Sequence, residues 1–171
     1  MGDSITQGLA VAAVAPYATN FGIGGETTAE LLDAMPSYKS LNRVDTVVLE
    51  IGINDLIQNR KEGLHERYRK IAASLPLKTT LIWSAVMPTG IKHINPTVIV
   101  EANRMIKTLC ETRDNCIFVD TWSFLADESG QPIPKNFLAD ATHLSPSGYR
   151  LWISAIKQAM LKSANGQIGG S

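Results

Sequence analysis

A serine near one end of the chain, and an aspartate and a histidine near the other, are residue types that together perform nucleophilic catalysis. Ser4 lies in the opening stretch MGDSITQG, and Asp140 and His143 lie in the stretch DATH. A serine hydroxyl is a poor nucleophile at neutral pH and needs an adjacent base, which a histidine provides because its ordinary pKa is near ~6.5. The histidine needs an acidic partner that orients its ring and stabilises the imidazolium form. If the fold brings them together, these residues indicate acyl transfer.

Attack on an acyl carbon also creates an oxyanion, which needs preorganised hydrogen-bond donors. The backbone N–H of Ser4, the backbone N–H of Gly25 in GGETT and the side-chain amide of Asn54 in GIND could supply three donors. Each has a structural alternative: Ser4 as a helix cap, Gly25 as a turn glycine and Asn54 as an Asx-turn residue. We assign that turn role to the neighbouring Asp55 and the oxyanion role to Asn54.

Other residues compete for places in such a site. Asp120 follows an apolar stretch, CIFV, and is the rival of Asp140 for the acidic role. His93 falls in a loop on the expected ligand-binding edge and could contact a substrate, whereas His65 falls in a charged helical segment and is expected at the surface. Trp122 is the one tryptophan close enough to a loop to be considered for substrate contact.

Apolar stretches and helical patterns alternate along the chain, which predicts a mostly parallel sheet with helices on both faces. In such sheets ligands bind beyond the carboxyl ends of the strands, where the loops carrying Ser4, Gly25, Asn54 and His143 are expected to meet. The expected strands are 16–23, 44–51, 79–86 and 116–120, and the expected helices are 28–35, 62–75, 95–110 and 145–161.

Four sequence blocks, GDSITQG, NFGIGGETT, GIND and DATH, occur in an order that resembles the SGNH (GDSL-type) hydrolase superfamily. The resemblance covers the chain from Gly2 to Tyr149 and is closest to small acetylhydrolases and arylesterases. It implies an α/β fold, a flavodoxin-like three-layer α/β/α sandwich. It also implies a site in which Ser4 is the nucleophile, His143 the base and Asp140 its orienting acid, with Ser4, Gly25 and Asn54 forming the oxyanion hole.

The chain departs from this family at its beginning, because the family's nucleophile follows a central strand of several apolar residues. Only Met1, Gly2 and Asp3 precede Ser4 here. We therefore expect the first strand to be shortened or missing. Three explanations stay open: the natural protein is longer, the sheet closes across the gap, or a partner covers the exposed edge. We predict self-association, with a homo-oligomer covering the region left open.

Composition limits the classes of protein to consider. The chain has 171 residues, of which 44% are hydrophobic, and it fits a single domain over 1–162 with a flexible tail over 163–171. Its 16 basic and 16 acidic residues argue against a nucleic-acid partner. No apolar run is long enough to span a membrane and no signal peptide is recognised, which favours a cytoplasmic protein while leaving the compartment open.

The two cysteines do not indicate a metal site, since no further ligands complete a zinc pattern. Cys110 and Cys116 are either two buried thiols or a local disulfide. No metal or organic cofactor is implied by any motif in the chain.

These observations predict a serine esterase that hydrolyses short-chain, acetyl-type esters through an acyl-enzyme intermediate. The loops after Ser4 and after Val86 are too short to build a deep lipid pocket, which favours small acyl groups. The alternatives are a thioesterase or lysophospholipase that uses the same residues, and a non-catalytic flavodoxin-like binding domain.

Overall fold

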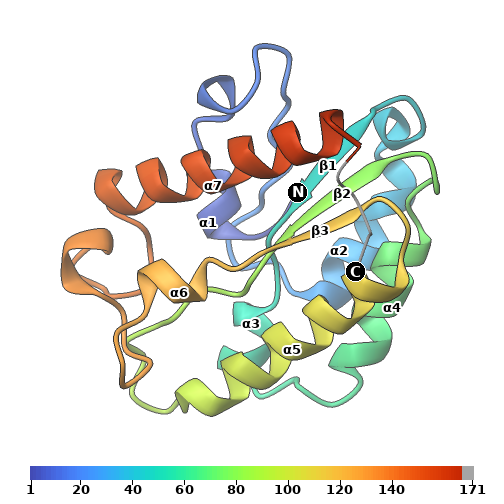
Figure 1. Cartoon of the computed structure of the whole chain (residues 1–171). Coiled ribbons are helices and arrows are strands. Elements are labelled where there is room, and N and C mark those ends of the chain that lie inside the picture. Colours follow the sequence, from blue (N-terminus) through green and yellow to red (C-terminus); the bar gives the residue numbers. More distant parts are fainter. Residues whose placement is uncertain (167–171) are drawn as a thin grey trace.

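The computed structural model describes residues 1–166 and contains a three-stranded parallel sheet (Figure 1). Its strands are β1 (Thr46–Leu49), β2 (Thr80–Ser84) and β3 (Cys116–Val119), which lie side by side in chain order. Val48 pairs with Ile82, and Ile82 pairs with Ile117. Strands with apolar residues on both faces suit a sheet that is covered on both sides.

Helices form a layer on each face of this sheet (Figure 1). One layer contains α7, and the other contains α2, α4 and α5. Three short helices, α1, α3 and α6, lie in connecting segments. The bounds are α1 Ser4–Gln7, α2 Thr28–Ala34, α3 Ile53–Ile57, α4 Leu64–Ala73, α5 Pro96–Thr112, α6 Trp122–Leu125 and α7 Pro146–Ala164.

The hydrophobic core has two main parts, one on each side of the sheet. On the α4 and α5 side, the rings of Tyr68 and Trp83 meet edge to face with their centroids 5.4 Å apart. On the α7 side, Trp152 is fully buried and its indole N–H donates to Ser84 Oγ over 2.8 Å. This arrangement is the predicted three-layer α/β/α sandwich.

The long helices begin where the sequence predicts, because their capping residues act locally. Asn95 Oδ1 accepts from the Thr97 N–H at the start of α5. Thr27 caps α2 in a capping box with Glu30, and Ser145 caps α7. The short helices α3 and α6 were not predicted, since neither extends beyond five residues and neither shows a helical apolar stripe.

The predicted strand over 16–23 does not form. Only Gly22 pairs, in an isolated parallel bridge with Gly2. A strand needs a paired neighbour along its length, and the described chain supplies one only at Met1 and Gly2. The first strand is correspondingly reduced to the bridges that Gly2 makes with Gly22 and Glu50, as expected for a shortened strand.

Several other expectations concern the ends of elements. The last helix continues to Ala164, two residues into the predicted tail, and residues 167–171 of that tail lie outside the described part of the chain.

Cys110 and Cys116, whose state could not be decided from the sequence, form a disulfide that joins the end of α5 to the start of β3. Within residues 1–166, no helix is both long and apolar enough to cross a bilayer.

Candidate active site

Ser4 is the first residue of α1, at the carboxyl-end edge of the sheet. The carboxylate of Asp3 caps this short helix by accepting from the Ile5 N–H over 2.9 Å. Gly2 has a φ of +145°, and a Cβ there would collide with the Glu50 carbonyl oxygen, so the chain can pass this point only as glycine. Tyr149 of α7 donates its hydroxyl to the Ile5 carbonyl over 2.9 Å and holds α1 in place.

A continuous hydrogen-bonded chain links Ser4, His143 and Asp140. Ser4 Oγ lies 2.9 Å from His143 Nε2, and His143 Nδ1 lies 2.8 Å from Asp140 Oδ2. The backbone N–H groups of His143 and Thr142 both donate to Asp140 Oδ1 over 2.9 Å. The hydrogen bonds from His143, with that from Thr142, lower the pKa of Asp140 to about 2. An ionised Asp140 accepts from Nδ1–H, which leaves Nε2 free to accept the Ser4 proton.

The loop that carries Asp140 and His143 rests on the loop that follows β2. The Gly90 N–H donates to the Ala141 carbonyl over 2.7 Å, and the hydroxyls of Thr89 and Thr142 are 2.7 Å apart. A Cβ at Gly90 would come within 2.6 Å of the Ala141 Cβ, so the two loops approach as closely as glycine allows. These contacts between the two loops were not predicted from the sequence. The available indication was that Thr89 and Gly90 follow a strand that ends at the same edge of the sheet.

The glycine turn lies next to the serine, and Asn54 is bonded to the end of that turn. A Cβ at Gly24 would stand 4.0 Å from Ser4 Cβ, so this turn borders the nucleophile. Gly25 has a φ of +79°, and nothing lies within 4 Å of where its Cβ would be. Asn54 Nδ2 donates to the Glu26 carbonyl over 3.0 Å, which ties the amide to the residue that follows the turn. The turn and the amide are thus held as one unit.

Asp55 has a structural role, but it is a link between elements and not the Asx turn that the sequence suggested. Its buried carboxylate accepts from the Thr28 N–H over 2.9 Å and from the Thr28 hydroxyl over 2.6 Å. Arg67 of α4 forms an ion pair with the same carboxylate over 3.2 Å. Asp55 therefore joins α2, α3 and α4, and it fixes the position of Asn54 beside it.

The competing residues are placed elsewhere. Asp120 Oδ1 accepts from the Ser123 N–H over 3.2 Å, and the acid that contacts His143 is Asp140. His93 Nε2 lies 3.4 Å from the Ile57 carbonyl oxygen, at an exposed position. The substrate-contact role considered for His93 has no supporting geometry in these contacts.

Three buried carboxyl groups, which were not predicted from the sequence, include that of Asp3 next to the nucleophile. Asp3 and Glu50 are both fully buried, and each carboxyl shifts the pKa of the other. Burial raises the pKa of Asp3 to about 6, and burial together with the charge of Asp3 raises the pKa of Glu50 well above its usual value. Burial also raises the pKa of Glu26 to about 7. Burial and the neighbouring carboxyl of Asp3 thus both disfavour the charged form of Glu50.

The hydrogen-bonded chain is open to solvent. The side chains of His143 and Asp140 are 41% and 49% exposed. Two cavities of about 440 and 390 Å³ lie elsewhere, and neither is lined by Ser4, Asn54 or His143. The acid and the base of the site are therefore accessible to solvent.

Comparison with solved structures gives the same fold. A GDSL-like lipase from Bacteroides thetaiotaomicron superposes with a TM-score of 0.78 at 24% identity, covering 95% of this chain and 86% of that one. An acetylxylan esterase from Geobacillus stearothermophilus, in a catalytic mutant form, gives 0.70 at 23% identity, covering 93% and 91%. A family 3 carbohydrate esterase from Clostridium thermocellum gives 0.63 at 20% identity, covering 86% and 71%.

Two sequence comparisons were made, and one of them identifies the family. A search of curated proteins found no match. The sequence model of the GDSL-like lipase/acylhydrolase family, in contrast, matches residues 1–151, which is most of the chain. The chain belongs to the GDSL-like lipase/acylhydrolase family and is a carboxylic ester hydrolase.

Proposed function

We propose that this protein hydrolyses short-chain, acetyl-type esters with Ser4 as its nucleophile. The observation that carries the proposal is the chain of hydrogen bonds from Ser4 Oγ through the His143 ring to Asp140. Ser4 Oγ attacks the ester carbonyl carbon while His143 Nε2 takes its proton. Asp140 stabilises the resulting imidazolium. The imidazolium then protonates the leaving alkoxide, the C–O bond breaks and the alcohol departs.

The second half of the reaction releases the acyl group. Water attacks the acyl-enzyme, His143 takes a proton from that water, and Ser4 leaves with the proton returned by His143. In both halves the carbonyl oxygen carries negative charge in the transition state. We assign the N–H groups of Ser4 and Gly25 and the amide of Asn54 as the donors that stabilise it.

Two observations support a small acyl group. The site is open to solvent, with the side chains of His143 and Asp140 close to half exposed, and a short acyl chain needs no tunnel. Two structural neighbours are esterases of carbohydrates, and one of these is named for acetylated xylan. A long acyl chain would leave much of its apolar surface in water and would gain little binding energy here.

Activity on p-nitrophenyl esters of increasing chain length tests this proposal. We expect kcat/KM to fall at least tenfold from the acetate to the octanoate, because the additional methylenes find no pocket. Acetyl thioesters and lysophosphatidylcholine serve as comparison substrates. A higher kcat/KM for either of these, or for the octanoate, would favour the thioesterase or lysophospholipase alternative, and absence of turnover with every substrate would favour a binding domain.

Replacing Asn54 with alanine tests the oxyanion assignment. We expect kcat to fall roughly a hundredfold with a small change in KM, because the amide acts mainly in the transition state. The matched control is Asn59→Ala, an exposed asparagine just after α3. Near-normal kcat in a folded Asn54→Ala protein would remove Asn54 from the site.

A further inference from the structure

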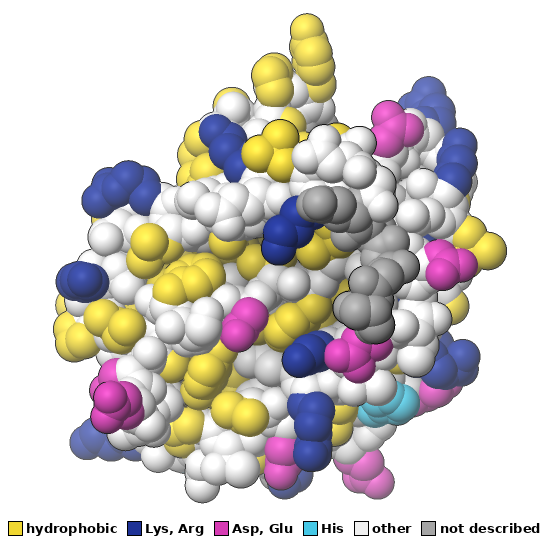
Figure 2. Space-filling view, viewed as in Figure 1, with side chains coloured by type: hydrophobic (Ala, Val, Ile, Leu, Met, Phe, Trp, Pro, Cys, Tyr) yellow, Lys and Arg dark blue, Asp and Glu magenta, His cyan; other side chains and the backbone are white. Residues whose placement is uncertain are grey.

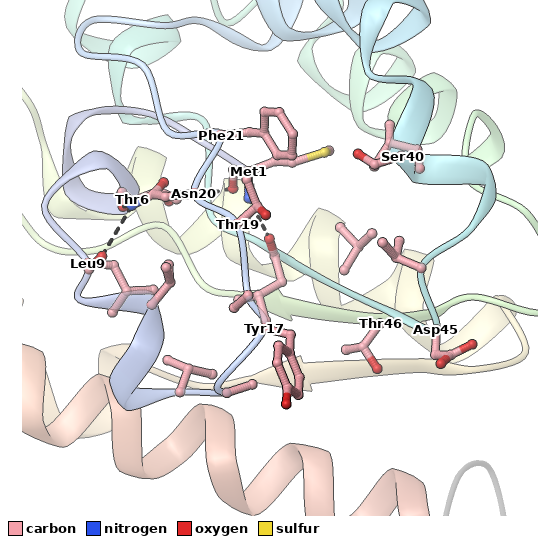
Figure 3. A pocket seen from close by; sticks show the side chains of 18 of the residues that line it. Met1, Thr6, Leu9, Tyr17, Thr19, Asn20, Phe21, Ser40, Asp45 and Thr46 are labelled. Carbon is pink, nitrogen blue, oxygen red and sulfur yellow. Dashed lines mark hydrogen bonds between the residues drawn. The ribbon is translucent and has the colours of Figure 1, made fainter.

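The side chain of Asn20 is bonded to backbone groups of two different segments of the site. Its nitrogen donates to the carbonyls of Thr6 over 2.8 Å, Gln7 over 3.2 Å and Leu9 over 3.2 Å. Its oxygen accepts from the Gly22 N–H over 2.8 Å. Figure 3 shows Asn20 beside Thr6. One side chain thus joins the end of α1 to the segment that leads into the glycine turn.

The carbonyls that Asn20 contacts belong to the carboxyl end of α1, where a helix leaves such groups unpaired. A helix of four residues is too short to be stable in isolation, so the position of α1 depends on contacts with the rest of the protein. Asp3 holds its amino end, Tyr149 bonds to its second residue and Asn20 holds its other end. Because Ser4 is the first residue of α1, these contacts also place Ser4 Oγ.

The bond from Gly22 to Asn20 places the glycine turn. A Cβ on Gly22 would collide with the backbone of α1, so the two segments are in direct contact. The turn follows at once: the Glu26 N–H donates to the Ile23 carbonyl over 3.2 Å and closes the turn that contains Gly25. Asn20 is therefore bonded both to the helix that carries the nucleophile and to the residue from which the turn begins.

The loop that joins α1 to Asn20 does not by itself fix the distance between them. Residues 10–19 run outward past α7 and return, as the blue segment at the top of Figure 1 shows. Hydrophobic side chains of this projecting segment are visible at the top of Figure 2, and the Tyr17 ring is fully exposed. A projecting loop constrains its two ends less than direct bonds between them do. The bonds of Asn20 therefore set the spacing.

We propose that Asn20 is a positioning residue of the esterase reaction, which sets the distance between Ser4 Oγ and the Gly25 N–H. The inference rests on the proposed function, because it takes Ser4 as the nucleophile and Gly25 as a donor to the oxyanion. Asn20 itself contacts no reacting atom. Without it, α1 and the turn can move apart, which weakens interactions made in the transition state and leaves binding of the ester largely unchanged.

A local role in the chain before the turn would require only part of these bonds. Acceptance from the Gly22 N–H forms an Asx turn, and the shorter side chain of serine forms the same type of turn. The donors to α1 are different, because the hydroxyl of serine lies one atom closer to the backbone and does not reach the Thr6 carbonyl. Asn20→Ser therefore keeps the turn and removes the connection to α1, whereas Asn20→Ala removes both.

The test is steady-state hydrolysis of p-nitrophenyl acetate by Asn20→Ala and Asn20→Ser. Titration with a fluorophosphonate, carried to completion, counts the reactive serines, so that kcat is expressed per competent site and unfolded protein does not enter it. We expect kcat to fall at least tenfold in both variants, with KM within twofold of the parent. The matched control is Asn42→Ala, an exposed asparagine in the short helical segment Lys39–Asn42, which should keep kcat within twofold.

A double variant separates positioning from a general loss of stability. Asn54 is bonded to the residue that ends the turn, so Asn20→Ala and Asn54→Ala disturb the same group of donors. Their effects on kcat should therefore be less than multiplicative. We expect Asn20→Ala to lower kcat threefold or less in the Asn54→Ala protein, against at least tenfold in the parent. A general loss of stability would lower kcat by the same factor in both proteins.

Four results would overturn the role of Asn20. These are parent-like kcat per site in Asn20→Ala, parent-like kcat in Asn20→Ser, a loss confined to KM, and multiplicative effects in the double variant. Ser4→Ala tests the proposed function separately. An inactive Ser4→Ala protein beside a fully active Asn20→Ala protein would leave the nucleophile assigned and remove only the role of Asn20, whereas an active Ser4→Ala protein would contradict the proposed function itself.

Discussion

Replacing Ser4 with alanine is expected to lower kcat/KM for p-nitrophenyl acetate by more than a thousandfold. Without Oγ no acyl-enzyme forms, and only the oxyanion donors and substrate binding remain. Alanine is a good helix former and the Asp3 cap stays in place, so the fold should be unaffected. The measurement is steady-state hydrolysis, with circular dichroism to establish that the variant is folded.

Ser37→Ala is the matched control for this variant. Ser37 is exposed, lies in the segment after α2, and bonds only to the Ala34 carbonyl in the described contacts. Its activity should stay within twofold of the parent. If Ser4→Ala retains most of its activity, the nucleophile lies elsewhere and the catalytic assignment fails.

Replacing Asp140 with asparagine is expected to lower kcat by about a thousandfold. The amide cannot accept from His143 Nδ1–H through its nitrogen, so the ring is no longer held with Nε2 toward Ser4. The asparagine side chain is neutral, so it also no longer stabilises the imidazolium form of His143 by charge. Because the pKa of Asp140 is lowered to about 2, the carboxylate is ionised throughout the working range, and the loss should be seen at every pH at which the enzyme is active.

The parallel substitution Asp120→Asn separates the two acids that the sequence left in competition. The hydrogen bonds of Asp120 in the described structure go to Ser123 and not to His143, so this variant should keep kcat within about threefold. A large loss in Asp120→Asn with near-normal activity in Asp140→Asn would reverse the assignment.

The sequence predicted the fold wherever the information is local. Continuous apolar stretches indicated the three strands of the sheet, and Thr27, Asn95 and Ser145 marked the starts of helices, because a cap depends on residues within one turn. The segment 16–23 has strand composition but did not become a strand. Strand formation there depends on a neighbour from elsewhere in the chain, and composition does not report neighbours.

In the candidate site, too, the residue types could be predicted from the sequence, whereas the geometry depends on residues distant in the chain. Residue types and their order indicated Ser4, Asp140 and His143. The distances among them depend on a tight turn at Ala141, which has a φ of +53°, and on support from Gly90, fifty residues earlier in the chain. The buried pairing of Asp3 with Glu50 was equally out of reach, since in the sequence Glu50 is one charged residue at the end of an apolar stretch.

Mass spectrometry after treatment with a fluorophosphonate shows directly whether Ser4 is the nucleophile. We expect one covalent adduct per chain, located on the peptide that contains Ser4, formed with time and in step with the loss of esterase activity. The Ser4→Ala protein should remain unlabelled. An adduct on another residue, or full inactivation with Ser4 unmodified, would contradict this assignment.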